Sequence, residues 1–238
     1  MKILLRFLFL IALIGSMGAS WPLDLFASST NNELFGTSPW IERQVTIIKS
    51  RHAANNLDPT VLRLSLKAYI NARKYGLDKK QLLTIIDYSK PSTEKRLWVI
   101  DLHNGKTLFY TWVSHGRNSG GIYSTSFSNV QGSLKSSLGV FVTTSEPYVG
   151  SVGYALRLKG LEPGVNDNAY DRAVVVHGAA YVNSDTIRKY GQIGRSWGCP
   201  AVGSDLARPI INTIKENTIV FAYYPDRKWL SHSQFLAA

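Results

Sequence analysis

Apolar residues change their spacing at Pro91, and this change limits the possible folds more than any other feature of the chain. Before Pro91, they recur at intervals that place them on one face of a helix. Ser38-Pro39 and Asp58-Pro59 each combine a polar cap with a first-turn proline, which is typical of a helix start, and Gly76 suits a helix end. The helices that we expect here cover residues 38–54, 58–76 and 78–86.

After Pro91, short runs of β-branched and aromatic residues alternate with turn residues, which is typical of strands. The runs 97–102 and 107–113 flank Asn104-Gly105, so we expect a hairpin with a type I′ turn. The other expected strands cover residues 138–143, 154–158, 173–176 and 218–224, and helical segments cover 184–191 and 204–214. The pattern predicts an α+β fold, in which a β-rich domain at 93–238 follows a small N-terminal helical region at 38–92.

Residues 1–20 have the pattern of a secretory signal peptide. Lys2 and Arg6 precede the apolar run 7–14, and small residues allow cleavage near Ser20. This run is short for a membrane span, which takes about 20 residues, although an uncleaved anchor is the alternative. We expect residues 21–37 to be a linker. The expected location is the periplasm or the cell envelope, with membrane contact only during export.

Charge and cysteine content narrow the possible functions. Lys and Arg number 27 against 16 Asp and Glu, which gives a formal net charge of +11. The basic residues are spread along the chain, so nucleic acid is not an expected partner. For an exported protein, the expected polyanion is the envelope, where peptidoglycan stem peptides carry carboxylates. The single cysteine, Cys199, excludes an internal disulfide, so the core alone must stabilise the domain.

Cys199 lies in a context that is unlike a core strand. It belongs to the stretch 194–200, Gly-Arg-Ser-Trp-Gly-Cys-Pro, and His177 ends a strand-like run 22 residues upstream. A cysteine nucleophile needs a base to form the thiolate and backbone amides to bind the oxyanion. A lone cysteine is also compatible with a small buried apolar residue, but this context favours a catalytic thiol.

The two segments resemble the murein L,D-transpeptidases, the YkuD-like cysteine enzymes of bacterial cell-wall assembly. The family pattern is a His-Gly pair, here His177-Gly178, followed by Ser-x-Gly-Cys, here residues 196–199. The chain is most similar to a divergent branch in which tryptophan, here Trp197, replaces a second histidine. The resemblance covers about residues 95–223 and implies a β-rich transpeptidase-like catalytic domain.

The resemblance also implies acyl transfer through a thioester on Cys199, with His177 as the base. The Gly178 carbonyl would orient the His177 ring, and the amides of Gly198 and Cys199 would form the oxyanion hole. Arg195 would lower the thiol pKa or hold a substrate carboxylate, and a solvated arginine is the alternative. The expected substrate contacts are Arg195, Ser196, Trp197, Tyr181 and His115.

His115 lies in the glycine-rich loop 114–121, which we expect to form an active-site wall, with a plain surface loop as the alternative. The expected function is that of an exported L,D-transpeptidase acting on tetrapeptide stems, and carbapenem β-lactams are expected inhibitors. An L,D-carboxypeptidase and a degenerate peptidoglycan-binding module remain alternatives. No cofactor or metal is expected, because the sequence has no Cys/His cluster with zinc spacing and no dinucleotide-binding fingerprint.

Overall fold

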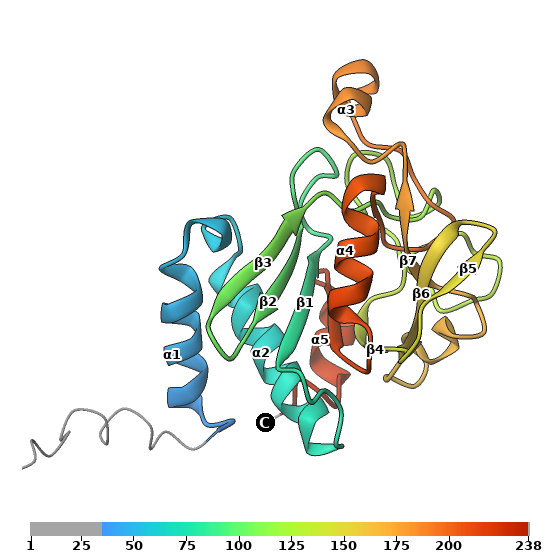
Figure 1. Ribbon diagram of the computed structural model, residues 1–238. Coiled ribbons are helices and arrows are strands. Elements are labelled where there is room, and N and C mark those ends of the chain that lie inside the picture. The colour runs from blue at the N-terminus through green and yellow to red at the C-terminus, as the bar shows by residue number, and fades with distance from the viewer. Residues whose placement is uncertain (1–34, 238) are drawn as a thin grey trace, which may run out of the picture. The chain divides into compact units, whose positions relative to one another are not determined.

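A mixed sheet organises the part of the protein that the computed structural model describes, residues 35–237 (Figure 1). The expected signal peptide and most of the expected linker lie outside these residues. The helices are α1 (Ser38–Lys49), α2 (Pro59–Lys74), α3 (Ser184–Tyr190), α4 (Ser204–Ile214) and α5 (Arg227–His232). The strands are β1 (Leu82–Asp87), β2 (Leu97–Asp101), β3 (Lys106–Thr111), β4 (Gly139–Thr143), β5 (Tyr148–Gly150), β6 (Gly153–Gly160), β7 (Val175–Ala179), β8 (Ala201–Gly203) and β9 (Ile219–Tyr223).

The order of strands across the sheet is β3-β2-β1-β9-β4-β6-β7-β8, and β5 pairs with β6. Two of these pairs are parallel, β1 with β9 and β7 with β8, and the other pairs are antiparallel. The α+β fold class expected from the sequence is therefore confirmed. The last strand of the sequence, β9, lies inside the sheet between β1 and β4.

The third expected helix, residues 78–86, is wrong, because Leu82–Asp87 forms β1. All six residues of β1 are buried, and the strand lies between β2 and β9. An apolar run of this length cannot be assigned to helix or strand by periodicity alone. Asp78 and Gln81 both have a positive φ, which is incompatible with a continuing helix. Residues on both sides of the expected boundary at 92 and 93 thus contribute strands to one sheet.

The helices cover the sheet as their sequences predict. Helix α2 packs against β1 and β9, and α4 packs against β6 and β7; Figure 1 shows α4 in front of the strands. Asp58 caps α2, since its Oδ1 accepts hydrogen bonds from the amides of Thr60 and Val61. None of the helices within residues 35–237 is both long and apolar enough to cross a membrane.

The expected β2–β3 hairpin is present, but its turn is not of type I′. That type needs a positive φ at both central residues, and of the Asn104-Gly105 pair only Gly105 has one. Helix α1 ends at Lys49, earlier than expected, and a short 3-10 turn follows at His52–Ala54. Helix α4 begins after Gly203 without a side-chain cap.

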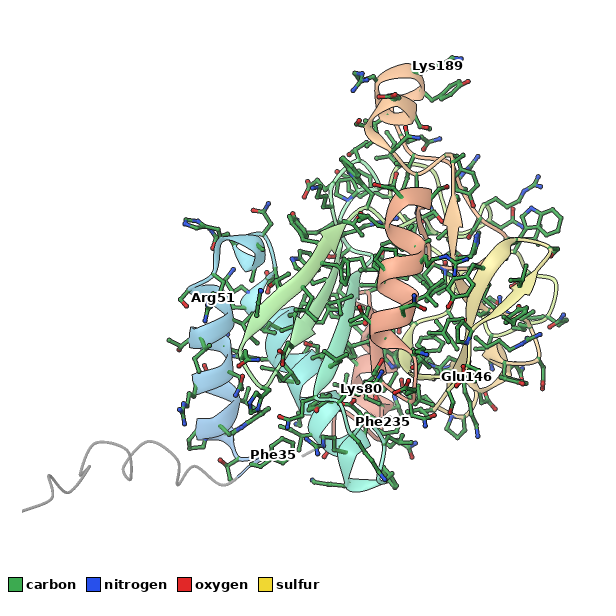
Figure 2. All side chains as sticks on the ribbon, in the orientation of Figure 1. Phe35, Arg51, Lys80, Glu146, Lys189 and Phe235 are labelled. Carbon is green, nitrogen blue, oxygen red and sulfur yellow. The ribbon has the colours of Figure 1, made fainter. Side chains whose placement is uncertain are left out.

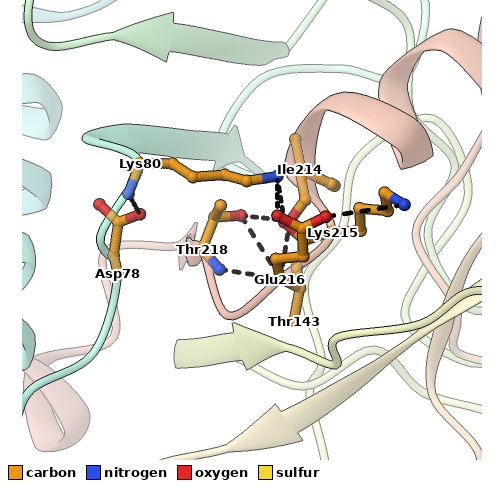
Figure 3. Close-up of polar contacts among 7 residues, drawn as sticks. All are labelled: Asp78, Lys80, Thr143, Ile214, Lys215, Glu216 and Thr218. Carbon is orange, nitrogen blue, oxygen red and sulfur yellow. Dashed lines mark hydrogen bonds and ion pairs between the residues drawn. The ribbon is translucent and has the colours of Figure 1, made fainter.

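A polar cluster fixes the turn between α4 and β9 to β4 and to the start of β1 (Figure 3). Thr143 Oγ1 donates to the Ile214 carbonyl at 2.7 Å, and the Thr218 amide donates to Thr143 Oγ1 at 2.9 Å. Lys80 Nζ donates to the Lys215 carbonyl at 2.9 Å and lies 3.0 Å from a Glu216 carboxylate oxygen. These bonds satisfy carbonyls at the end of α4 and hold the end of the helix against β4 and the start of β1.

Candidate active site

A cavity of about 650 Å³ lies where β7 and β8 meet the loop that precedes β8. Most of the residues expected at the site line it, although they come from two separate segments of the sequence. These residues are Cys199, His177, Gly178, Tyr181, Arg195, Ser196 and Trp197. Arg172, Ala173 and Tyr148 also line the cavity and were not expected there.

The parallel pairing of β7 and β8 explains why Cys199 and His177 share this cavity. His177 is paired with Ala201, and Cys199 lies two residues before Ala201, level with Val175. Side chains two residues apart in an extended chain point to the same face, so the sulfur and the imidazole lie on one side of the strands. Gly178 allows α4 to pack closely behind them, since a Cβ at this position would lie 2.9 Å from the Ala207 Cβ.

His177 is held as a neutral base. Its side chain is 6% exposed, and Nδ1 lies 2.9 Å from the Gly178 carbonyl oxygen, the hydrogen bond expected from the sequence. A carbonyl can only accept, so Nδ1 carries the proton and Nε2 has the free lone pair. Burial lowers the pKa of His177 below its ordinary value, and the bond to Gly178 offsets part of that effect. The ring is therefore ready to accept a proton at neutral pH.

The Cys199 thiol is half-buried and protonated at rest. Its Sγ lies 3.7 Å from the Ala173 carbonyl oxygen, to which it donates. Burial raises the pKa of the thiol, while a hydrogen bond from the Val175 amide and the charge of Arg172 lower it. Because the net shift is upward, the resting pair is a neutral thiol and a neutral imidazole. A thiol in this state needs a base to take its proton before it can act as a nucleophile.

Arg172, rather than Arg195, supplies the positive charge at the sulfur. The Arg172 guanidinium is fixed by neutral acceptors: Nη1 donates to the Ser128 carbonyl and Ser137 Oγ, and Nη2 to the Lys135 carbonyl and Ser133 Oγ. No carboxylate pairs with Arg172 among residues 35–237. Its charge is therefore available to a developing thiolate.

Arg195 lines the cavity, but its Nη1 donates to the backbone carbonyls of Arg117 and Gly120 at 3.2 and 3.0 Å. The charge that lowers the thiol pKa is that of Arg172, and Arg195 does not contribute to the shift. It remains a candidate to contact a substrate carboxylate.

Hydrogen bonds within the turn 196–199 occupy most of its polar groups near Cys199. Ser196 Oγ donates to the Cys199 carbonyl at 2.6 Å and accepts from the Gly198 amide at 3.1 Å. Ser196 is 4% exposed, so its hydroxyl shapes the turn and is not free for the expected substrate contact. The Gly198 amide is occupied in the same way, which contradicts its expected place in the oxyanion hole. The Cys199 amide, by contrast, has no hydrogen-bond partner within the described residues.

His115 is not part of the cavity wall, contrary to expectation. Its side chain is 1% exposed, and its Nδ1 accepts a hydrogen bond from Arg96 Nη2 at 2.7 Å. Burial and the charge of Arg96 lower the pKa of His115 to about 4. The His115 carbonyl accepts a hydrogen bond from the Ser196 amide at 2.9 Å. His115 therefore helps to hold the turn that precedes Cys199.

Trp197 stands at the rim between the active-site cavity and a second cavity of about 480 Å³. Its side chain is 74% exposed, and Tyr181 and Arg195 also line both cavities. Arg117 and Tyr190 line only the second cavity, and Tyr190 is the last residue of α3. Figure 2 shows the neighbouring residue, Lys189, at the tip of this helix. No Asp or Glu lines either cavity, so the joined surface is positively charged. No group of three or more His, Cys, Asp and Glu side chains in the described part is placed to hold a metal.

A family model of the L,D-transpeptidase catalytic domain matches residues 53–223. This span is well over half of the 238-residue chain. The chain belongs to the L,D-transpeptidase catalytic-domain family. The match starts before α2 and includes β1. No curated protein sequence matches the chain.

Three solved structures that are similar to this chain carry the name L,D-transpeptidase. One from Mycobacterium smegmatis is 14% identical, with a TM-score of 0.39 over 60% of this chain and 59% of that one. One from Mycobacterium tuberculosis is 15% identical, with a TM-score of 0.37 over 60% and 58%. One from Stackebrandtia nassauensis is 13% identical, with a TM-score of 0.36 over 75% and 76%. The chain therefore spans less than two thirds of the length of the mycobacterial L,D-transpeptidases to which it is similar.

Proposed function

We propose that the protein is an exported cysteine L,D-transpeptidase that acts on peptidoglycan tetrapeptide stems, by cross-linking them or by exchanging their terminal D-residue. The observation that carries this proposal is the convergence of Cys199, neutral His177 and Arg172 on one cavity. A thiol, a base and a nearby positive charge are what thioester chemistry requires.

The proposed reaction begins when Nε2 of His177 takes the Cys199 proton. The sulfur then attacks the carbonyl carbon between the third residue of the stem, an L-centre, and the terminal D-Ala. The C–N bond breaks, the His177 proton goes to the leaving amine of D-Ala, and a thioester remains. An acceptor amine loses a proton to His177 and attacks the thioester. A new amide forms and the thiol is regenerated.

Transfer is favoured over hydrolysis by the second cavity beside Trp197. Arg117 and Arg195 line it without any carboxylate, so it suits an acceptor amine that itself bears a carboxylate. Tyr181 and Trp197 give the passage between the cavities apolar walls that limit access of water to a thioester. If water resolved the thioester instead, the protein would be an L,D-carboxypeptidase. If no thioester formed, it would be a peptidoglycan-binding module.

Incubation with a disaccharide tetrapeptide and a free D-amino acid tests this proposal. We expect exchanged D-residues or cross-linked dimers, detected by mass spectrometry, to outnumber tripeptide products. Tripeptide alone would indicate a carboxypeptidase, and no product would favour the binding module. Arg117→Gln should weaken transfer to the D-amino acid but not to its amide, which lacks the carboxylate. Equal loss with both acceptors would contradict the assignment of the second cavity.

Export is part of the proposal and is supported by the pattern of residues 1–20. Fusion of these residues to a phosphatase that is active only outside the cytoplasm should give an active reporter. Substitution of the apolar run 7–14 by polar residues should abolish the signal.

A further inference from the structure

The hydrogen bonds of the Gly198 and Cys199 backbone suggest how the turn at the nucleophile is oriented. The Gly198 amide donates to Ser196 Oγ at 3.1 Å, and the Cys199 carbonyl accepts from the same hydroxyl at 2.6 Å. The Gly198 carbonyl accepts from Ser136 Oγ at 3.1 Å. Of the four polar groups of these two residues, only the Cys199 amide lacks a partner within residues 35–237.

The Ser136 hydroxyl accepts one hydrogen bond and donates its proton to the Gly198 carbonyl. A hydroxyl has one proton and two lone pairs. The Gly116 amide donates to Ser136 Oγ at 3.0 Å and occupies one lone pair. The single proton of Ser136 is directed at Gly198.

The direction of the Cys199 amide follows from that bond. The Gly198–Cys199 peptide is planar and trans, so its carbonyl and its amide point in opposite directions. The carbonyl points to Ser136, which is 0% exposed, and the amide therefore points away from this buried layer. The orientation depends on Gly198, whose φ of 124° is rare for other residues. A Cβ at Gly198 would also lie 2.8 Å from the Lys135 carbonyl oxygen.

We propose that Ser136 is a positioning residue for the oxyanion site: it holds the Gly198 carbonyl so that the Cys199 amide faces the substrate carbonyl oxygen. The inference rests on the proposed acyl transfer at Cys199. Without Ser136 the peptide can rotate, and the donor would no longer be fixed when the tetrahedral oxyanion forms. Within residues 35–237, the thiol makes no hydrogen bond to Ser136 or to its partners.

Two reagents that react with the same sulfur separate this role from a merely structural one. Iodoacetamide alkylates the thiolate by displacement of iodide, and no oxyanion forms on the way. p-Nitrophenyl acetate acylates it: the C–S bond forms through a tetrahedral oxyanion, the ester C–O bond breaks, and p-nitrophenolate leaves. The ester needs no recognition of a stem peptide, so its reaction reports on the oxyanion site alone.

The experiment compares Ser136→Ala with the wild-type protein and with Ser65→Ala as a matched control. Ser65 is also 0% exposed and donates to a backbone carbonyl, that of Leu62, but it lies on α2. We expect Ser136→Ala to slow burst acylation by about 10- to 100-fold while alkylation stays within about 2-fold. Ser65→Ala should change neither rate. Ser136→Cys, which keeps a weak donor, should fall between Ser136→Ala and the wild type.

Equal acylation rates in Ser136→Ala and the wild type would overturn the inference, and so would an equal loss of acylation and alkylation. If Ser136→Ala does not fold, as judged by its melting transition, an acylation defect in Ser136→Cys with normal alkylation supports the inference and its absence overturns it. The proposed function fails separately, if the wild-type protein is acylated by the ester but processes no tetrapeptide stem.

Discussion

A fall to mildly acidic pH should destabilise the fold, because buried His115 resists protonation. His115 Nδ1 accepts from Arg96 Nη2 at 2.7 Å, so a proton on Nδ1 would remove this bond and place two cations in contact. Nε2 lies 3.4 Å from the Gly120 carbonyl oxygen, which fixes the neutral tautomer with the proton on Nε2. Burial first, and then the charges of Arg96 and Arg195, lower the pKa of His115 from 6.5 to about 4.

The sign and size of the effect follow from linkage. A histidine with a lowered pKa in the folded state contributes stability above pH 6.5, and this contribution is lost as the pH falls towards 4. Between pH 7.5 and pH 5.0, His115 binds a proton in the unfolded chain but stays neutral in the folded protein. The free energy of unfolding should therefore fall by about 2 kcal/mol from this one group.

Urea denaturation at the two pH values measures this loss. His115→Gln should lose about 2 kcal/mol less than the wild type, because the glutamine amide can accept from Arg96 and donate to Gly120 without titrating. His103→Gln, a change at an exposed histidine, should behave as the wild type does. An equal loss in the wild type and His115→Gln would refute the argument that His115 is buried as a neutral base.

Three further predictions concern the site. Arg172→Gln should raise the thiol pKa further, so that the pH profile of iodoacetamide alkylation moves to higher pH. Arg195→Gln should leave this profile unchanged. A shift with Arg195→Gln alone would contradict the role given to Arg172. Gly198→Ala should lower the free energy of unfolding, measured in urea, by at least about 2 kcal/mol and abolish acylation, because Gly198 has a positive φ and lies against the Lys135 carbonyl. Gly164 also has a positive φ but faces open space, so Gly164→Ala should lower it by only about 1 kcal/mol. In the wild type, alkylation should still rise above pH 9.0, since burial raises the Cys199 pKa; a plateau at neutral pH would indicate a preformed thiolate.

The elements with strong local signals were predictable from the sequence. Asp58-Pro59 and Gly76 bracket α2, and Asn104-Gly105 marks the turn region of the β2–β3 hairpin. Strand β1 was mistaken for a helix, because a strand buried on both faces shows no alternation that would distinguish it. Strands β5 and β8, of three residues each, and helix α5, of six residues, are too short to show a period at all.

At the site, the meeting of Cys199 and His177 in one cavity was predictable because residue type and glycine context mark both segments. Arg172 was missed because what places it beside Cys199 is a set of carbonyl and serine oxygens from residues 128–137, and no spacing in the sequence records such a set. Ser136 was missed because its bond to the Gly198 carbonyl joins residues that are far apart in the sequence, and no local pattern marks it. His115 was misplaced because a histidine in a glycine-rich loop suggests exposure, and only the fold brings buried Arg96 against it.

The most direct test of the central claim is the intact mass of the protein after incubation with a carbapenem. If Cys199 forms a thioester with His177 as its base, the wild type should gain the mass of one β-lactam and Cys199→Ala should gain none. His177→Ala should react several orders of magnitude more slowly. An unmodified wild-type protein after long incubation, or an adduct on Cys199→Ala, would contradict the account.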